Sequence, residues 1–128
     1  MSIGLLFITH NQIGADLLST AEDIFGCTLP MMTKVIDIKP DSNYEQKLMQ
    51  AEDCIEKLDT GDGVLVLTDI FGATPNNIAT KAAQEHNARV LAGVNLPMVV
   101  RVLNYHHLPL NKIVDKATSA GHDSIIQS

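Results

Sequence analysis

The sequence has no tryptophan, and aromatic residues make up only 4% of its 128 positions. Few side chains are therefore available to stack on single-stranded bases. Positive charge is also scarce, because nine Lys and Arg stand against fifteen Asp and Glu and leave a net charge of −6. Nucleic acids and anionic lipids are held by clustered positive charge, so we expect neither as a direct partner.

Cysteines and long hydrophobic runs are few as well. Cys27 and Cys54 form neither a CxxC pair nor the cysteine pattern of a small secreted domain, which favours free thiols in a reducing compartment. The first apolar run, residues 3–8, follows no basic residue and is too short for a signal peptide or a membrane span. We therefore expect a cytoplasmic protein that begins at its native start. Its length and its 45% hydrophobic content fit one domain over residues 1–128.

Four short runs rich in aliphatic residues recur along the chain and have the length of buried strands. Between them lie segments whose apolar residues recur every three or four positions, which is typical of amphipathic helices. Strands that alternate with helices predict a parallel sheet with right-handed crossovers. The predicted strands are residues 3–8, 34–38, 64–68 and 89–93.

Several helix boundaries can be predicted from capping residues. Gly26 is placed to end a helix that carries an apolar stripe over residues 17–25. Ser42 and Glu45 have the spacing of a capping box before the stripe of residues 44–58. Thr74 is a candidate N-cap for a helix over residues 75–85 with Pro75 in its first turn. Two shorter helices are predicted over residues 96–103 and 109–119, and the tail containing Ile125 and Ile126 could add an antiparallel edge strand.

The fold expected from this order is α/β and doubly wound, with a four-stranded parallel sheet of order 2-1-3-4 and helices on both faces. In that order the first and third strands are neighbours, and a crevice opens beyond their carboxyl ends. His10 comes directly after the first predicted strand, and Asp69 comes directly after the third. We therefore expect an imidazole and a carboxylate to face each other across this crevice.

The loop that follows Asp69 leads into the start of the third helix, where unpaired N–H groups attract anions. Gly72 and Ala73 leave space for an anion, and the Thr74 hydroxyl could cap the helix or bind that anion. A histidine, a carboxylate and an anion site together suit a transient phosphohistidine. Asp69 would fix the tautomer of His10, and the other ring nitrogen would attack phosphorus. The alternative is that His10 is an ordinary solvated loop residue.

At these residues the chain resembles the IIA component of the mannose-type sugar phosphotransferase system. The matching stretches are residues 3–10, 63–77 and 92–98, in the same order and at similar distances. The resemblance implies that His10 carries the phosphoryl group on Nε2, with Asp69 bonded to the other nitrogen and Thr74 standing near the phosphate where the family usually has Ser. We expect Phe71, Gly72, Ala73 and Thr74 to bind the phosphate. It also implies a phosphohistidine carrier protein as donor, a IIB component as acceptor, and a homodimer that exchanges its C-terminal strand.

Two features depart from the family pattern. Ala73 and Thr74 replace the more common Gly and Ser, which adds two methyl groups at the anion loop but keeps the hydroxyl. The sequence ends at Ser128 without the IIB domain that some relatives carry, so we expect the acceptor to be another protein and any link to the membrane to be indirect. Sugar transport and regulation both stay open as roles.

Three apolar residues near the crevice are candidates for contact with a docking protein or for the core: Phe71, Leu96 and Met98. We expect no metal site, because the adjacent His106 and His107 lack partners at ligand spacing. No phosphate-binding P-loop pattern is present, so we expect no nucleotide cofactor. The alternative function is a module that binds a metal or another small ligand through His10.

Overall fold

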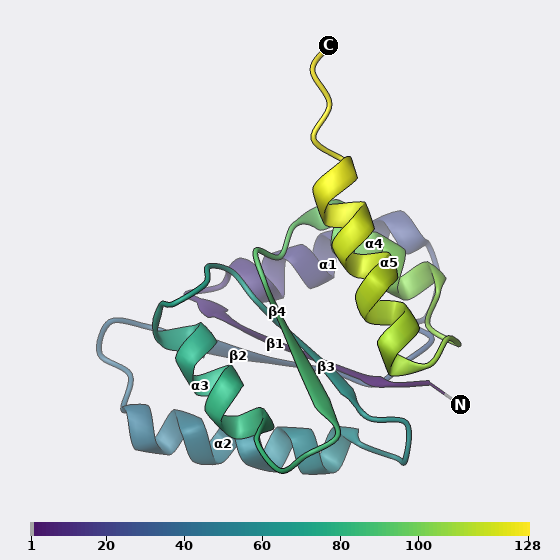
Figure 1. Ribbon diagram of the computed structural model, residues 1–128. Coiled ribbons are helices and arrows are strands. Elements are labelled where there is room, and N and C mark those ends of the chain that lie inside the picture. The colour runs from purple at the N-terminus through teal and green to yellow at the C-terminus, as the bar shows by residue number, and fades with distance from the viewer. Residues whose placement is uncertain (1) are drawn as a thin grey trace.

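The computed structural model describes residues 2–128, which form one parallel sheet of four strands covered by helices on both faces (Figure 1). The sheet order is β2-β1-β3-β4, which confirms the predicted order. The strand bounds agree with the predicted runs to within two residues at each end. The strands are β1 (Gly4–His10), β2 (Thr33–Ile38), β3 (Val64–Thr68) and β4 (Ala88–Ala92).

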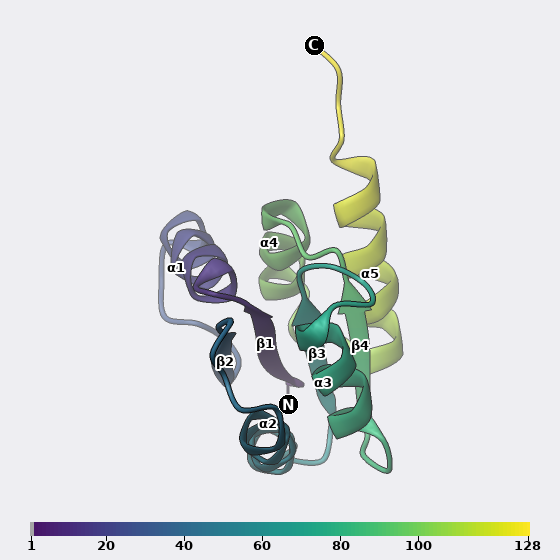
Figure 2. The same cartoon turned by 90° about the vertical axis from the view of Figure 1, so that its left-hand side faces the viewer.

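Within residues 2–128, five helices connect and follow the strands. They are α1 (Ile13–Phe25), α2 (Tyr44–Leu58), α3 (Thr74–Ala83), α4 (Leu96–Asn104) and α5 (Leu110–Asp123). Figure 2 shows α1, α4 and α5 side by side along one side of the strands, with α2 on the other. Among the helices of residues 2–128, none is both long enough and apolar enough to cross a membrane.

A hydrophobic core lies on each face of the sheet, and the central strand β1 contributes side chains to both. Successive side chains of a strand point to opposite faces. Leu5 and Phe7 pack in the cluster that α1, α4 and α5 cover, and Leu6 and Ile8 pack in the cluster that α2 and α3 cover. All four side chains are fully buried. Each such residue contributes about 1.5–3 kcal/mol of hydrophobic stabilisation, so the position of β1, and with it of His10 at its end, is strongly determined.

Helix α1 ends as the sequence predicts. Gly26 adopts a φ of 82°, in the left-handed region that glycine tolerates, and its N–H donates to the Glu22 carbonyl at 2.9 Å. The predicted apolar stripe is narrower than expected, because Ile24 is 56% exposed while Leu18 and Ala21 are buried.

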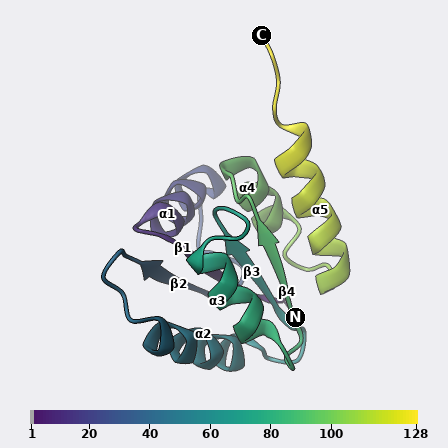
Figure 3. The ribbon, with the colours of Figure 1, turned by 60° about the vertical axis from the view of Figure 1, so that its left-hand side comes forward.

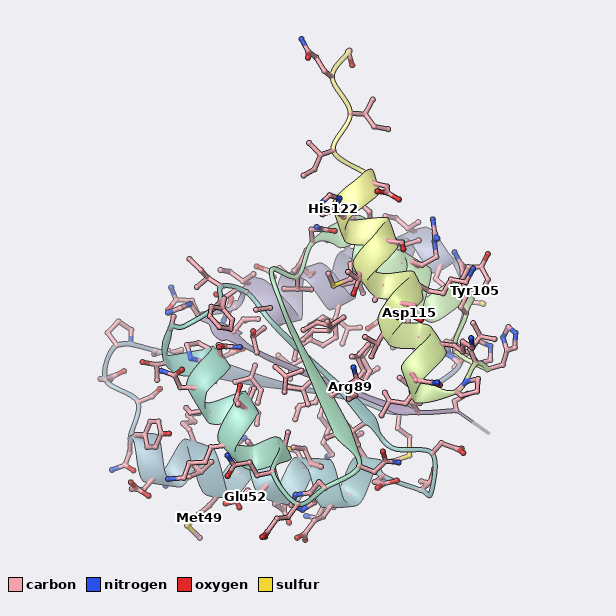
Figure 4. The ribbon with its side chains drawn as sticks, in the orientation of Figure 1. Met49, Glu52, Arg89, Tyr105, Asp115 and His122 are labelled. Carbon is pink, nitrogen blue, oxygen red and sulfur yellow. The ribbon has the colours of Figure 1, made fainter. Side chains whose placement is uncertain are left out.

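The predicted capping box at the start of α2 is wrong. Asn43 is the N-cap, and its side-chain oxygen accepts the Gln46 N–H at 2.9 Å. Ser42 instead accepts the Lys39 N–H through its hydroxyl, which stabilises the turn before the helix. The predicted stripe is confirmed from Leu48 to Leu58, but its first residue, Tyr44, is 37% exposed. Met49, outside the stripe, points outward from α2 (Figure 4).

The C-terminal tail does not form an edge strand within the chain. Residues 124–128 carry no strand, and Ile125 and Ile126 are 86% and 80% exposed. Figure 1 shows this tail extending away from the end of α5. An antiparallel strand here would need a pairing partner that the fold of a single chain does not supply.

Candidate active site

His10 and Asp69 meet at the carboxyl ends of two neighbouring strands. His10 is the last residue of β1, and Asp69 directly follows β3, which pairs with β1 so that Ile8 lies opposite Thr68. The Nδ1 atom of His10 lies 2.7 Å from Oδ2 of Asp69. The juxtaposition expected from the strand order is therefore present.

Asp69 also fixes the backbone at His10. The His10 N–H donates to the same Oδ2 atom at 3.0 Å, and the Ile70 N–H donates to Oδ1 at 3.1 Å. Burial is the largest influence on this carboxyl and acts to raise its pKa, but the hydrogen bonds from the His10 ring and N–H and the loop backbone outweigh it. The pKa of Asp69 is therefore lowered from its ordinary value, and the group is a carboxylate at neutral pH.

An ionised carboxylate only accepts hydrogen bonds, so the short contact assigns the proton of the neutral imidazole to Nδ1 of His10. The other ring nitrogen, Nε2, then holds a free electron pair. The His10 side chain is 42% exposed, whereas that of Asp69 is only 12% exposed. The arrangement thus combines a fixed, half-exposed imidazole whose Nε2 could act as a nucleophile with a sheltered carboxylate.

The backbone on both sides of His10 is held in place. The buried Thr9 hydroxyl accepts the Gly14 N–H at 2.7 Å, which joins the end of β1 to the first turn of α1. A Cβ atom at Gly14 would lie 2.9 Å from Cβ of Phe7, so only glycine allows this close approach. Asn11 makes the turn after His10 with a φ of 48°, and its N–H donates to the Ile38 carbonyl at 2.9 Å.

A cavity of about 390 Å³ opens beside His10. Thr74, at the start of α3, lines it as the sequence suggests, but residues from the segment after β2 line it too. The register explains their presence, because Ile38 pairs with His10 and the chain that follows β2 leaves from the same edge of the sheet (Figure 3). The lining comprises His10, Asn11, Ile38, Lys39, Pro40, Ser42, Tyr44, Lys47, Thr74 and Ile78.

The start of α3 differs by one residue from the prediction. Ala73 occupies the N-cap position without a side-chain cap, and Thr74 is the first helical residue, so its hydroxyl does not serve as the N-cap. The first bond of the helical ladder runs from the Asn77 N–H to the Ala73 carbonyl at 3.0 Å. The N–H groups of Thr74 and Asn76 therefore have no partner within the helix and are available to an anion.

Gly72 has a different role from the one expected. Its N–H donates to the side-chain oxygen of Asn76 at 3.1 Å, so this N–H is not free to hold phosphate. A Cβ atom at Gly72 would meet nothing within 4 Å, whereas its φ of 86° disfavours other residues. Glycine is therefore needed at this position for the backbone conformation of the turn, and not to leave room for an anion. Gly72 and Phe71 line a separate depression on the far side of α3, outside the cavity beside His10.

Asn76 is a site residue that the sequence reasoning missed. Its side chain is buried, and besides accepting the Gly72 N–H it donates through Nδ2 to the Thr68 hydroxyl at 3.4 Å. It thereby ties the loop before α3 to the end of β3. A polar residue in the first turn of a helix that follows a glycine turn is the signal that could have indicated this role.

Of the three apolar docking candidates, only Phe71 is suitably exposed. It is 84% exposed, and the neighbouring Ile70 is 58% exposed. Met98 is 5% exposed and lies in the core cluster covered by α1, α4 and α5, so of the two roles left open for it the structure supports the core and not docking. Leu96 is partly buried against the same cluster. The two residues lie on α4, whose amphipathic face turns them toward the sheet.

None of the other histidines lines the cavity beside His10. His106 contacts the Ser2 hydroxyl through Nδ1 at 3.0 Å, and Figure 4 shows His122 at the far end of α5. Across residues 2–128, no three side chains of His, Cys, Asp or Glu gather in a way that could hold a metal ion.

The chain is similar to known proteins in both sequence and fold. The sequence model of a family described as "PTS system fructose IIA component" matches residues 4–118. The chain is 36% identical over 104 residues to the mannose-specific EIIAB component of the phosphotransferase system of Escherichia coli K12, which covers 80% of this chain. The chain spans about a third (32%) of that relative's length.

Solved structures show the same fold. The mannose/sorbose-specific IIA subunit of Enterococcus faecalis superposes with a TM-score of 0.87 over 100% of this chain and 96% of its own, at 21% identity. The IIA protein associated with the fucose utilization operon of Streptococcus pneumoniae gives a TM-score of 0.82 at 24% identity, over 99% of this chain and 93% of its own.

Proposed function

The chain belongs to the mannose-type IIA components of the sugar phosphotransferase system, and from this membership we propose that it carries a phosphoryl group on Nε2 of His10. The observation that carries the proposal is the 2.7 Å contact between Nδ1 of His10 and Oδ2 of Asp69. This contact leaves Nε2 as the nucleophile and orients the ring. The 42% exposure of the His10 side chain supports access by a protein donor.

In the proposed reaction the electron pair of Nε2 attacks phosphorus in the phosphohistidine of a donor protein. The new bond joins His10 Nε2 to phosphorus, the bond from phosphorus to the donor nitrogen breaks, and its electron pair stays on the donor ring. The proton on Nδ1 remains in its bond to Asp69. Because the His10 ring gains positive charge as the bond forms, the adjacent carboxylate stabilises the transfer.

The phosphoryl group in transit carries negative charge that the amino end of α3 would stabilise. The N–H groups of Thr74 and Asn76 have no partner within the helix, and the Thr74 hydroxyl lines the cavity beside His10. This proposed anion site differs from the expected one, which also included Phe71, Gly72 and Ala73. These three residues do not line the cavity beside His10. Handing the group to an acceptor reverses the same step.

The proposed partners are a phosphohistidine carrier protein as donor and a IIB component or a regulatory protein as acceptor. Ile70 and Phe71 follow Asp69 directly and are exposed, which supports their use as apolar contacts for these proteins. We also propose a homodimer that exchanges its C-terminal strands. The exposed Ile125 and Ile126 in a tail without intrachain pairing support this assembly.

The proposal is tested by incubating the purified chain with enzyme I, the phosphocarrier protein and phosphoenolpyruvate. We expect one acid-labile phosphate per chain, which His10→Ala abolishes and His122→Ala leaves in place, since His122 is exposed on α5. Phosphate uptake by the His10→Ala variant would contradict the proposal. Absence of uptake by the unaltered chain together with stoichiometric metal in the purified protein would instead support the metal-binding alternative.

A further inference from the structure

Two lysines contribute to the wall of the cavity beside His10. Lys39 follows β2 directly, and Lys47 lies near the start of α2. Both line the cavity together with His10 and Thr74, and the lining contains no aspartate or glutamate. In a chain with a net charge of −6, two lysines therefore line the cavity on one side, while the Asp69 carboxylate is hydrogen-bonded to the His10 ring.

Neither lysine is used in an ion pair of the fold. Within the part of the chain that the structure describes, the ion pairs are His10–Asp69, Lys57–Asp53, His86–Glu56 and His122–Asp123. Lys47 lies near the amino end of its helix, where the helix dipole disfavours a cation. The placement of these two charges therefore brings no evident gain in stability.

The backbone that carries each lysine is firmly held. The Lys39 N–H donates to the Ser42 hydroxyl at 2.9 Å, and the Ser42 N–H donates back to the Lys39 carbonyl at 3.0 Å. The preceding Ile38 carbonyl accepts the Asn11 N–H, which ties this turn to the residue after His10. Lys47 is anchored through its N–H, which donates to the Asn43 carbonyl at 3.0 Å. The backbone of Lys39 is thus fixed relative to the segment that follows His10, and the backbone of Lys47 is fixed within the first turns of α2.

We propose that Lys39 and Lys47 bind the phosphoryl group once it is attached to Nε2 of His10 and stabilise the phosphorylated state. This inference rests on the function proposed above and adds the residues that hold the charge. A phosphoryl group brings close to two negative charges, and the positive charge of a lysine that lines the same cavity attracts it. The lysines exchange no proton and form no covalent bond, so the balance of the transfer step is unchanged.

The direct test is the equilibrium of phosphate between the phosphocarrier protein and this chain. Contacts that only dock the two proteins alter the rate of exchange, whereas the equilibrium between the free proteins depends on the phosphorylated and unphosphorylated states alone. We expect Lys39→Gln and Lys47→Gln each to shift the equilibrium toward the donor by about threefold to tenfold at low salt, and the double variant to shift it further. Raising the ionic strength should reduce these shifts.

Matched controls separate charge at the cavity from general effects. Lys112→Gln removes an exposed lysine from α5 and should leave the equilibrium unchanged. Lys39→Arg and Lys47→Arg should retain most of the unaltered chain's phosphorylation, since the charge is kept, and thermal melting verifies that each variant is folded. A double glutamine variant that melts normally and has the unaltered equilibrium constant at low salt would overturn this inference. If the unaltered chain takes up no phosphate on His10, the proposed function itself fails, so the two failures are distinguishable.

Discussion

Replacing Asp69 by asparagine removes one negative charge from the site with little change in volume. Asp69 accepts hydrogen bonds from the His10 ring, the His10 N–H and the Ile70 N–H. A hydrogen bond to a charged group contributes about 1.5–3 kcal/mol, against about 0.5–1.5 kcal/mol for a neutral pair. Loss of the charge opposite Nδ1 should therefore cost about 1–2 kcal/mol in the transition state, which slows transfer about fivefold to thirtyfold.

A second effect acts in the same direction. The asparagine amide can present its NH₂ group to Nδ1 of His10, which places the ring proton on Nε2 and removes the nucleophilic electron pair. We therefore expect Asp69→Asn to slow phosphorylation by about tenfold or more.

The assay is rapid-quench measurement of phosphate transfer from the phosphocarrier protein, with Asp115→Asn as the matched control. Asp115 is an exposed residue of α5, remote in the chain from either strand end (Figure 4). The control should transfer phosphate at the unaltered rate. Transfer by Asp69→Asn at that same rate, in a variant that melts normally, would refute the reasoning about the carboxylate.

Further predictions concern pH, docking, packing and the turn before α3. Because the folded-state pKa of Asp69 is lowered, its contribution to stability is complete above the unfolded pKa of about 3.9 and is lost as the pH falls through the folded value. Urea titrations below about pH 4 should show a weaker loss of stability with acid for Asp69→Asn than for the unaltered chain. Phe71→Ser should leave the melting temperature unchanged but slow transfer from the protein donor, since this side chain is 84% exposed; a lowered melting temperature would instead assign Phe71 to the core. Met98→Ala should lower the free energy of unfolding by about 2–5 kcal/mol in urea titrations and leave transfer intact below the melting temperature. Gly72→Ala should cost about 1–2 kcal/mol because of the positive φ, and an unchanged urea midpoint would count against this.

The sheet could be predicted because each strand is marked by its own short stretch of sequence, and the same kind of stretch recurs four times. Each strand is a short aliphatic run, and the run of residues 64–68 matches β3 without a shift. Once the strand order follows from the crossover rules, the carboxyl ends of β1 and β3 must be neighbours, so the meeting of His10 and Asp69 could be expected from sequence.

The predicted helix starts were wrong where two neighbouring residues could each serve as the N-cap. Ser42 and Asn43 are both good N-caps, and the hydrogen bond from Lys39 decides that Ser42 caps the turn while Asn43 caps the helix. Spacing alone carries no information on this choice. Ala73 and Thr74 show the same one-residue ambiguity at the start of α3.

The lysines beside His10 were missed for a different reason. We expected the site to be formed only by residues at the ends of β1 and β3. Strand β2 also ends at this edge of the sheet, where Ile38 pairs with His10. Lys47 reaches the cavity only because α2 packs on the same face as α3, where both helices contribute to one core cluster. This contact joins segments far apart in the sequence and depends on tertiary packing, which periodicity does not describe.

The most direct test of the account is heteronuclear NMR of the phosphorylated chain with ¹⁵N-labelled histidine. We expect a single phosphorus nucleus coupled to Nε2 of His10, with Nδ1 still protonated and bonded to Asp69. Phosphate on Nδ1, on another residue, or on no residue after complete exchange with the donor would contradict the central claim that this imidazole carries the phosphoryl group.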